Sequence, residues 1–268
     1  MQMPPNRFKA ALAGSTTQYG LWAGFATGYA AEIAASTGYD WLLIDGEHAP
    51  NTVPSILAQL QAVAPYASAP VVRAVNGDSS LIKQLLDIGV QSLMVPMVET
   101  AEQARQLVRA MRYPPHGIRG VGGGLARATR WDGVPDYLAT AHEELCLIVQ
   151  VESKLGVENV ADIAAVEGVH AVFVGPADLS SGLGFPGNPG HPEVQAQIRT
   201  AIDATLAAGK IAGILAPFEE DARRYREWGC QFIAVGIDIS LFRQAALNNL
   251  ARYREPDGAP ATGPSRTY

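Results

Sequence analysis

The chain has 268 residues, of which 48% are hydrophobic, and its formal net charge is −6 at pH 7. This length suits one large α/β domain, and the acidic balance, with Lys and Arg scattered along the chain, argues against nucleic acid as a partner. No apolar run approaches the roughly 18 uncharged residues of a membrane span, and the first residues do not form an export signal. We therefore expect a cytoplasmic protein that does not bind membranes.

Along the chain, short apolar runs alternate with polar corners and longer segments of helical spacing. This alternation predicts parallel strands at residues 20–25, 41–45, 70–74, 92–96, 145–151, 171–175, 211–214 and 232–236. Helices are expected at residues 29–37, 79–87, 101–112, 193–208 and 219–228. Eight nearly continuous hydrophobic strands suit a closed (β/α)8 TIM barrel. The competing open doubly wound sheet usually carries a Gly-rich dinucleotide motif after its first strand, which is missing here.

Two segments depart from this alternation. Residues 113–142 contain a Gly-rich run at 117–124 and are expected to form a long loop over one end of the barrel. A phosphate-binding loop would end in Gly-Lys-Ser/Thr, which this run lacks, so a flexible loop is favoured. Residues 256–268 are rich in Pro, Gly and Ala and are expected to be a disordered tail after a single domain of residues 1–255.

Polar residues at the carboxyl ends of barrel strands are the candidates for function, because active sites of such barrels lie there. The fifth predicted strand ends in Gln150 and Glu152, which share a face because side chains alternate along a strand. The sixth leads into Asp178. Two carboxylates on adjacent strand ends predict an oxygen-ligand site for a hard divalent cation. The alternative is that Glu152 caps the next helix and Asp178 anchors a turn.

Two further strand ends carry candidate catalytic groups. Asp45 lies three residues before His48 after the second strand, where it can orient the imidazole for proton exchange near neutral pH. A lone histidine is more often structural. Arg73 ends the third strand among apolar neighbours, so its charge needs an anionic partner. That partner is either a substrate carboxylate or enolate, or a carboxylate of the protein itself.

These residues resemble the HpcH/HpaI family of class II pyruvate aldolases, which includes 4-hydroxy-2-oxoheptanedioate aldolase and related hydroxy-ketoacid aldolases. The similarity covers roughly residues 8 to 255. It is carried, in chain order, by residues 41–51 (WLLIDGEHAPN), 71–73 (VVR), 119–121 (RGV) with 125–128 (LARA), 150–153 (QVES) and 174–180 (VGPADLS).

The resemblance implies a barrel of the phosphoenolpyruvate/pyruvate-binding type. It implies an aldolase that reversibly cleaves 4-hydroxy-2-oxo acids to pyruvate and an aldehyde through a metal-stabilised enolate, with a role in the breakdown of aromatic compounds. Glu152 and Asp178 would ligate Mg2+, Mn2+ or Co2+, which chelates the carboxylate and keto oxygens of pyruvate. Gln150 would lie beside the metal.

The resemblance also implies roles for the other candidates. Arg73 would stabilise the enolate oxygen, and His48, oriented by Asp45, would take part in proton transfer. The substrate-binding residues that it implies are Arg73, Gln150, Ala177 and Asp178 with nearby backbone N–H groups, Leu215 on the apolar side, and Arg127 in the matched LARA segment.

Three alternatives compete with this interpretation. A class I aldolase needs a lysine on an inward strand position to form a Schiff base, but Lys9, Lys83, Lys154 and Lys210 lie in or near helical segments. A citrate-lyase-β-like lyase acting on a CoA thioester shares the barrel and the acidic metal site. A non-catalytic metabolite-binding barrel would not need a base, a cation and two metal ligands at one barrel mouth.

The resemblance finally implies a homohexamer built as a pair of trimers. The last helix, residues 241–253, would be exchanged between neighbours, and Asp87 would reach a neighbouring active site. The sequence leaves the aldehyde partner open, because acceptor pockets depend on loops and on neighbouring subunits.

Overall fold

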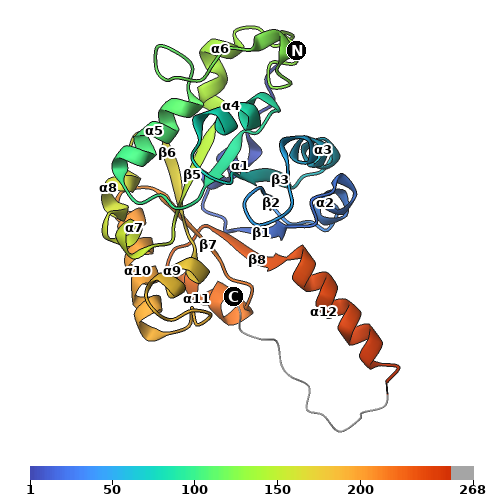
Figure 1. Ribbon diagram of the computed structural model, residues 1–268, viewed down its shortest axis with the longest axis vertical. Coiled ribbons are helices and arrows are strands. Elements are labelled where there is room, and N and C mark those ends of the chain that lie inside the picture. Colours follow the sequence, from blue (N-terminus) through green and yellow to red (C-terminus); the bar gives the residue numbers. More distant parts are fainter. Residues whose placement is uncertain (255–268) are drawn as a thin grey trace.

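Eight parallel strands close into one barrel, in which each strand pairs with its neighbours in sequence order (Figure 1). The structure is a computed structural model and describes residues 1–254. The strands are β1 (Gln18–Ala23), β2 (Trp41–Asp45), β3 (Ala69–Arg73), β4 (Ser92–Val95), β5 (Cys146–Val151), β6 (Val169–Val174), β7 (Ile211–Leu215) and β8 (Phe232–Ile237). The predicted (β/α)8 barrel is confirmed. The expected tail at residues 256–268 lies outside the described residues.

Helices pack around the barrel, except the last, which extends away from it (Figure 1). They are α1 (Arg7–Leu12), α2 (Gly28–Ala35), α3 (Val53–Val63), α4 (Ser79–Asp87), α5 (Ala101–Met111), α6 (Tyr137–Thr140), α7 (Lys154–Glu158), α8 (Val160–Ala165), α9 (Pro176–Gly182), α10 (Pro192–Ala207), α11 (Glu219–Glu227) and α12 (Asp238–Ala251). Helix α3 adds to the helices expected from the sequence. It begins where Thr52 and Ser55 exchange side-chain-to-backbone hydrogen bonds in a capping box.

Strand β1 ends two residues earlier than predicted. The backbone N–H groups of Gly24 and Phe25 donate to the carboxylate of Asp238, at 2.9 and 3.2 Å, instead of extending the ladder toward β2. Asp238 begins α12, more than two hundred residues later in the chain. The strand boundary therefore depends on a distant side chain, which local hydrophobicity does not reveal.

Large aromatic side chains fill the inside of the barrel. Trp41, Phe173 and Phe232 are buried and pack with ring centroids 5.7 to 5.8 Å apart in neighbouring pairs. A Cβ atom added at Gly20 would overlap the Trp41 ring, and one at Gly213 would overlap the Phe232 ring. The interior is thus a packed core, as expected for this fold, and leaves room for a ligand only at the mouth.

The long connection between α5 and β5 lies at the end of the barrel where the strands begin. It contains short 3-10 turns at Gly123–Leu125 and Ala141–Glu144, together with α6. Helix α6 and the N-terminus lie near each other at the top of Figure 1, whereas α7, α9 and α11 follow the carboxyl ends of their strands at the opposite end. The Gly-rich run is therefore remote from the strand ends that carry the candidate catalytic groups.

Helix α12 extends away from the barrel (Figure 1). None of its residues is buried by the rest of residues 1–254, although it carries several apolar side chains. Among residues 1–254, no helix combines the length and the apolar character that crossing a bilayer requires.

Candidate active site

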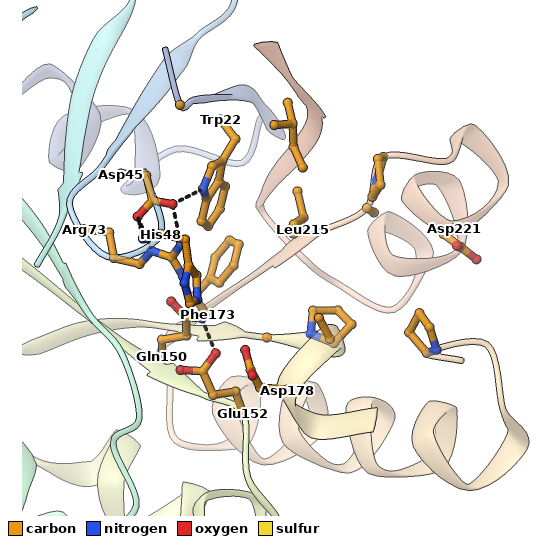
Figure 2. A pocket seen from close by; sticks show the side chains of 18 of the residues that line it. Trp22, Asp45, His48, Arg73, Gln150, Glu152, Phe173, Asp178, Leu215 and Asp221 are labelled. Carbon is orange, nitrogen blue, oxygen red and sulfur yellow. Dashed lines mark hydrogen bonds and ion pairs between the residues drawn. The ribbon is translucent and has the colours of Figure 1, made fainter. Parts of the chain in front are cut away.

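A pocket of about 390 Å³ opens at the carboxyl ends of the strands. Eight of the nine residues proposed from the sequence line it: Asp45, His48, Arg73, Gln150, Glu152, Ala177, Asp178 and Leu215. Figure 2 labels all of them except Ala177 and shows that they come from different strands and from the segments that follow these strands. The ninth, Arg127, does not line this pocket. Its guanidinium donates to the carbonyl of Ile88 at 2.9 Å, near the start of β4 and therefore at the opposite end of the barrel.

Arg73 is held by two carboxylates of the protein. Its Nε and Nη2 donate to the two oxygens of Asp45, at 2.9 and 2.6 Å, and its Nη1 lies 2.8 Å from the Glu47 carboxylate. The guanidinium also lies over the Trp22 ring, 4.8 Å from its centroid. The internal ion pair, one of the two partners considered for this residue, is thus present in the structure.

The Asp45 carboxylate remains charged in spite of its burial. Burial alone would raise its pKa, but the hydrogen bonds and charge of Arg73, with a further bond from the Trp22 indole at 3.0 Å, lower the pKa below its ordinary value. The pKa of Glu47 is raised instead, mainly by burial, with Arg73 only partly opposing the shift. The Arg73 charge is therefore tied most firmly to Asp45.

Asp45 and His48 are connected through the backbone. The Asp45 carboxylate accepts the backbone N–H groups of Glu47 at 2.9 Å and of His48 at 3.4 Å, so it shapes the turn that carries the imidazole. The His48 side chain is 69% exposed at the pocket rim, and its Nε2 lies 3.9 Å from the Glu47 carboxylate. The acidic group nearest the imidazole is thus Glu47, whereas the sequence pattern had indicated Asp45.

Glu152 is a buried carboxylate whose orientation is fixed from both sides. One oxygen accepts the backbone N–H of Met97 at 2.8 Å, and the other accepts the side-chain amide of Gln150. Capping of the following helix falls to Ser153, whose Oγ accepts the N–H of Gly156. The helix-capping alternative for Glu152 is therefore not what the structure shows.

Asp178 lies beside Glu152 in the pocket (Figure 2). It is exposed in the first turn of α9, and no hydrogen bond or ion pair engages its carboxylate within residues 1–254. Burial raises the pKa of Glu152 to about 7, and the negative charges of Asp178 and Glu47 add to this, while the bonds from Met97 and Gln150 oppose it. Two carboxylates that disfavour each other's charge form an environment that a cation would stabilise.

The donor set fits a hard divalent cation. Besides the two carboxylates, the Oε1 atom of Gln150 is buried and has no hydrogen-bond partner among the described residues. No cluster of three or more His, Cys, Asp or Glu side chains suited to a metal occurs in the part of the chain that the structure describes. The protein therefore offers two carboxylate ligands and would leave positions for water or substrate, as Mg2+ sites commonly do.

Comparison with known proteins identifies the family. Residues 18–245 match the family model described as HpcH/HpaI aldolase/citrate lyase. This chain belongs to that family. Both activities in the description cleave carbon–carbon bonds, so the predictions of family and of a carbon–carbon lyase are confirmed.

Close relatives of this chain are aldolases. It is 72% identical to a hydroxypyruvate/pyruvate aldolase of Delftia acidovorans, with all of both chains covered. It is 54% identical to a 2-keto-3-deoxy-L-rhamnonate aldolase of Escherichia coli, covering 95% of this chain and 96% of the relative. The crystal structure of a family member from Burkholderia cenocepacia superimposes with a TM-score of 0.90 at 42% identity, covering 93% of this chain and all of the other.

The structure adds three residues to the site that sequence reasoning missed. Trp22 covers the Arg73 guanidinium, Glu47 shares that cation, and Met97 holds Glu152. A sequence signal existed for Glu47, which lies inside the segment that carries the family resemblance. Trp22 lies within the first predicted strand but is apolar enough to pass for core. Met97 acts through its backbone, and its residue type therefore gave no indication.

Proposed function

We propose that this chain is a metal-dependent class II aldolase that reversibly cleaves 4-hydroxy-2-oxo acids to pyruvate and an aldehyde. The observation that carries the proposal is the buried Glu152 carboxylate, which lies beside Asp178 and next to the Gln150 oxygen that has no partner within residues 1–254. The names of the relatives, a hydroxypyruvate/pyruvate aldolase and a 2-keto-3-deoxy-L-rhamnonate aldolase, support the same reaction class.

Glu152 and Asp178 would hold the divalent cation, with Mg2+, Mn2+ and Co2+ as candidates. Such a cation supplies Lewis acidity that lowers the free energy of a pyruvate enolate. The protein's part is to present both carboxylates on one side of the pocket and to fix Glu152 through Met97 and Gln150. A prearranged ligand loses less entropy when it binds.

Arg73 has donors left for the enolate. A guanidinium carries five N–H groups, and the bonds to Asp45 and Glu47 use three of them. The two remaining hydrogens are on the terminal nitrogens of a side chain that lines the pocket. Because Asp45 and Glu47 hold the guanidinium in place, it needs little rearrangement to stabilise negative charge as it develops on the substrate oxygen.

The other pocket residues bind substrate and move protons. The backbone N–H groups of Ala177 and Asp178, in the first turn of α9, are available for the pyruvate carboxylate, because the first N–H groups of a helix have no partner within it. Leu215 supplies apolar surface. His48, exposed at the rim, is the group that exchanges a proton with the aldehyde or alcohol oxygen during addition and cleavage.

Exchange of the pyruvate methyl protons with solvent deuterium tests this function without knowledge of the aldehyde. NMR should show exchange by the protein with Mg2+, Mn2+ or Co2+, loss of exchange on chelation, and loss in Glu152→Gln. Metal-independent exchange, or full exchange in a folded Glu152→Gln/Asp178→Asn variant, would disprove the metal assignment. Cleavage of a CoA thioester without pyruvate exchange would instead indicate a citrate-lyase-like reaction.

We further propose that the chain assembles as a homohexamer, a pair of trimers that exchange α12. Its exposed apolar side chains, Ile239, Leu241, Phe242, Leu247 and Leu250, would be covered by a second copy. In such an assembly, Arg127 and Asp87, which do not line the pocket of their own chain, would approach a neighbouring one. Light scattering should give a hexameric mass, and Leu247→Asp should reduce it; a monomeric wild-type protein would contradict the proposal.

A further inference from the structure

The segment that connects β4 to α5 contacts the Glu152 strand end directly. Met97 adopts the left-handed backbone conformation, with φ of 55°, and this turns its N–H onto Glu152. The next N–H, of Val98, donates to the Gln150 carbonyl at 3.0 Å. Left-handed conformation costs a non-glycine residue roughly 1–2 kcal/mol, so contacts elsewhere must hold this turn.

Glu99 supplies such contacts two residues later. The Ser153 hydroxyl donates to the Glu99 carboxylate at 2.7 Å, and the Asn159 side chain donates to the Glu99 carbonyl at 2.8 Å. The Glu99 backbone N–H donates in turn to Gln103, in the first turn of α5. Glu99 thus connects the β4–α5 segment to the beginning of α7 on the next strand end.

The chain order makes this connection relevant to Glu152. Ser153 follows Glu152 immediately, and its only hydroxyl hydrogen goes to Glu99, while the same oxygen accepts the Gly156 N–H that begins α7. On the other side, Glu99 is two residues from Met97. Glu152 is therefore fixed at two places: its carboxylate accepts the Met97 N–H, and its backbone continues into Ser153. Glu99 connects these two places, because it follows Met97 by two residues and accepts the Ser153 hydroxyl.

We propose that Glu99 is a positioning residue for the metal site. Its carboxylate keeps the β4–α5 segment against the start of α7, and so sets the direction in which Glu152 presents its oxygens to the pocket. The inference rests on the proposed function, in which Glu152 is a metal ligand. Glu99 does not line the pocket, so its effect must act through Met97 and Ser153.

Direct Mn2+ binding to the full-length protein, measured by electron paramagnetic resonance of the free ion, tests the inference without an activity assay. Removing a side chain that orients a metal ligand typically costs 10- to 100-fold in affinity, so Glu99→Ala should raise the Mn2+ Kd at least tenfold. Glu99→Gln keeps an oxygen that accepts from Ser153 and should stay within about threefold of wild type.

Glu102→Ala is the matched control. It removes the same charge three residues further along, from a side chain that is 64% exposed and bonded only to Arg105 and Gln106 among residues 1–254. Its Mn2+ Kd should equal that of wild type. Ser153→Ala deletes the same hydrogen bond from the other side, so it should weaken Mn2+ binding as well, and it carries the test if Glu99→Ala does not fold.

The outcomes separate this inference from the function on which it rests. Absence of Mn2+ binding by the wild-type protein would overturn the proposed metal site itself. Wild-type binding together with an unchanged Kd in both Glu99→Ala and Ser153→Ala would overturn the positioning role alone. Equal loss in Glu99→Gln and Glu99→Ala would also overturn it, because the lost quantity would then be charge and not the hydrogen bond to Ser153.

Discussion

Gly175 is the residue where a single methyl group should disturb the site most directly. It lies between β6 and α9, and its φ and ψ of −98° and 95° are accessible to alanine, so Gly175→Ala introduces no backbone strain. The added Cβ would lie 2.7 Å from the Glu152 Cβ and 3.1 Å from the Gln150 Nε2, and closer still to a Glu152 carboxylate oxygen. The effect of the substitution is therefore a steric displacement of Glu152.

The size of that displacement follows from the distances. Ordinary contact begins near 3.4 Å, so the Glu152 Cβ must move by about 0.7 Å from its 2.7 Å approach. Overpacking of this kind costs about 1–3 kcal/mol of stability, and a misplacement near 1 Å in a catalytic group can reduce rates about a hundredfold. We expect Gly175→Ala to lower the urea midpoint and to slow pyruvate proton exchange by at least tenfold.

Gly182→Ala provides the control in the same helix. Its added Cβ would meet no atom within 4 Å, so the substitution should leave exchange unchanged and raise stability by up to about 1 kcal/mol through helix propensity. Wild-type exchange and Mn2+ affinity in a folded Gly175→Ala protein would show that the position of Glu152 is not needed for the reaction.

Three further substitutions test other groups. Arg73→Ala should slow pyruvate exchange more than a hundredfold, which corresponds to an increase of about 3 kcal/mol in activation free energy. Normal exchange in a folded variant would show that Arg73 has only a structural role. His48→Ala should slow aldol cleavage about a hundredfold with unchanged Mn2+ affinity; an unchanged rate and acidic limb of the pH profile would assign the base elsewhere. Burial, aided by the charges of Lys9, Lys210 and Arg112, lowers the pKa of His170 to about 4. The unfolded chain therefore takes up a proton first as pH falls below about 6.5, so stability should fall by about 3 kcal/mol between pH 6.5 and 4. His170→Asn should flatten this loss and the exposed His116→Asn should not; equal slopes in urea titrations of all three proteins would refute the shift.

The barrel was predictable because most of its strands are continuous apolar runs. Parallel strands covered on both faces are apolar along their whole length, and the run at β2 is completely buried. Strand β1 was misplaced by two residues because Asp238, at the start of α12, takes the N–H groups of Gly24 and Phe25. A boundary set by a contact across the whole chain has no local sequence pattern.

The site was predictable to the extent that strand ends position side chains. Gln150 and Glu152 share a face because side chains alternate along a strand, and the structure brings both into the pocket. The hydrogen-bond and ion-pair partners of the candidate side chains were harder to predict from the sequence. Asp45 binds Arg73 and reaches His48 only through the backbone, because the turn after β2 directs the imidazole toward solvent. Such pairings depend on how adjacent strands are aligned, and in the structure Asp45 lies directly opposite Arg73.

The alignment of β2 with β3 also bears on the proposed metal site, because it places Asp45 opposite Arg73. Among the carboxylates near the mouth, those of Asp45 and Glu47 share the Arg73 charge, whereas those of Glu152 and Asp178 do not. Burial raises the pKa of Glu152 and the negative charge of Asp178 adds to this shift, and no basic side chain within residues 1–254 pairs with either carboxylate. Asp45 and Glu47 thus hold the Arg73 guanidinium, and in the proposed reaction it would act on substrate while a metal ion occupies the position between Glu152 and Asp178.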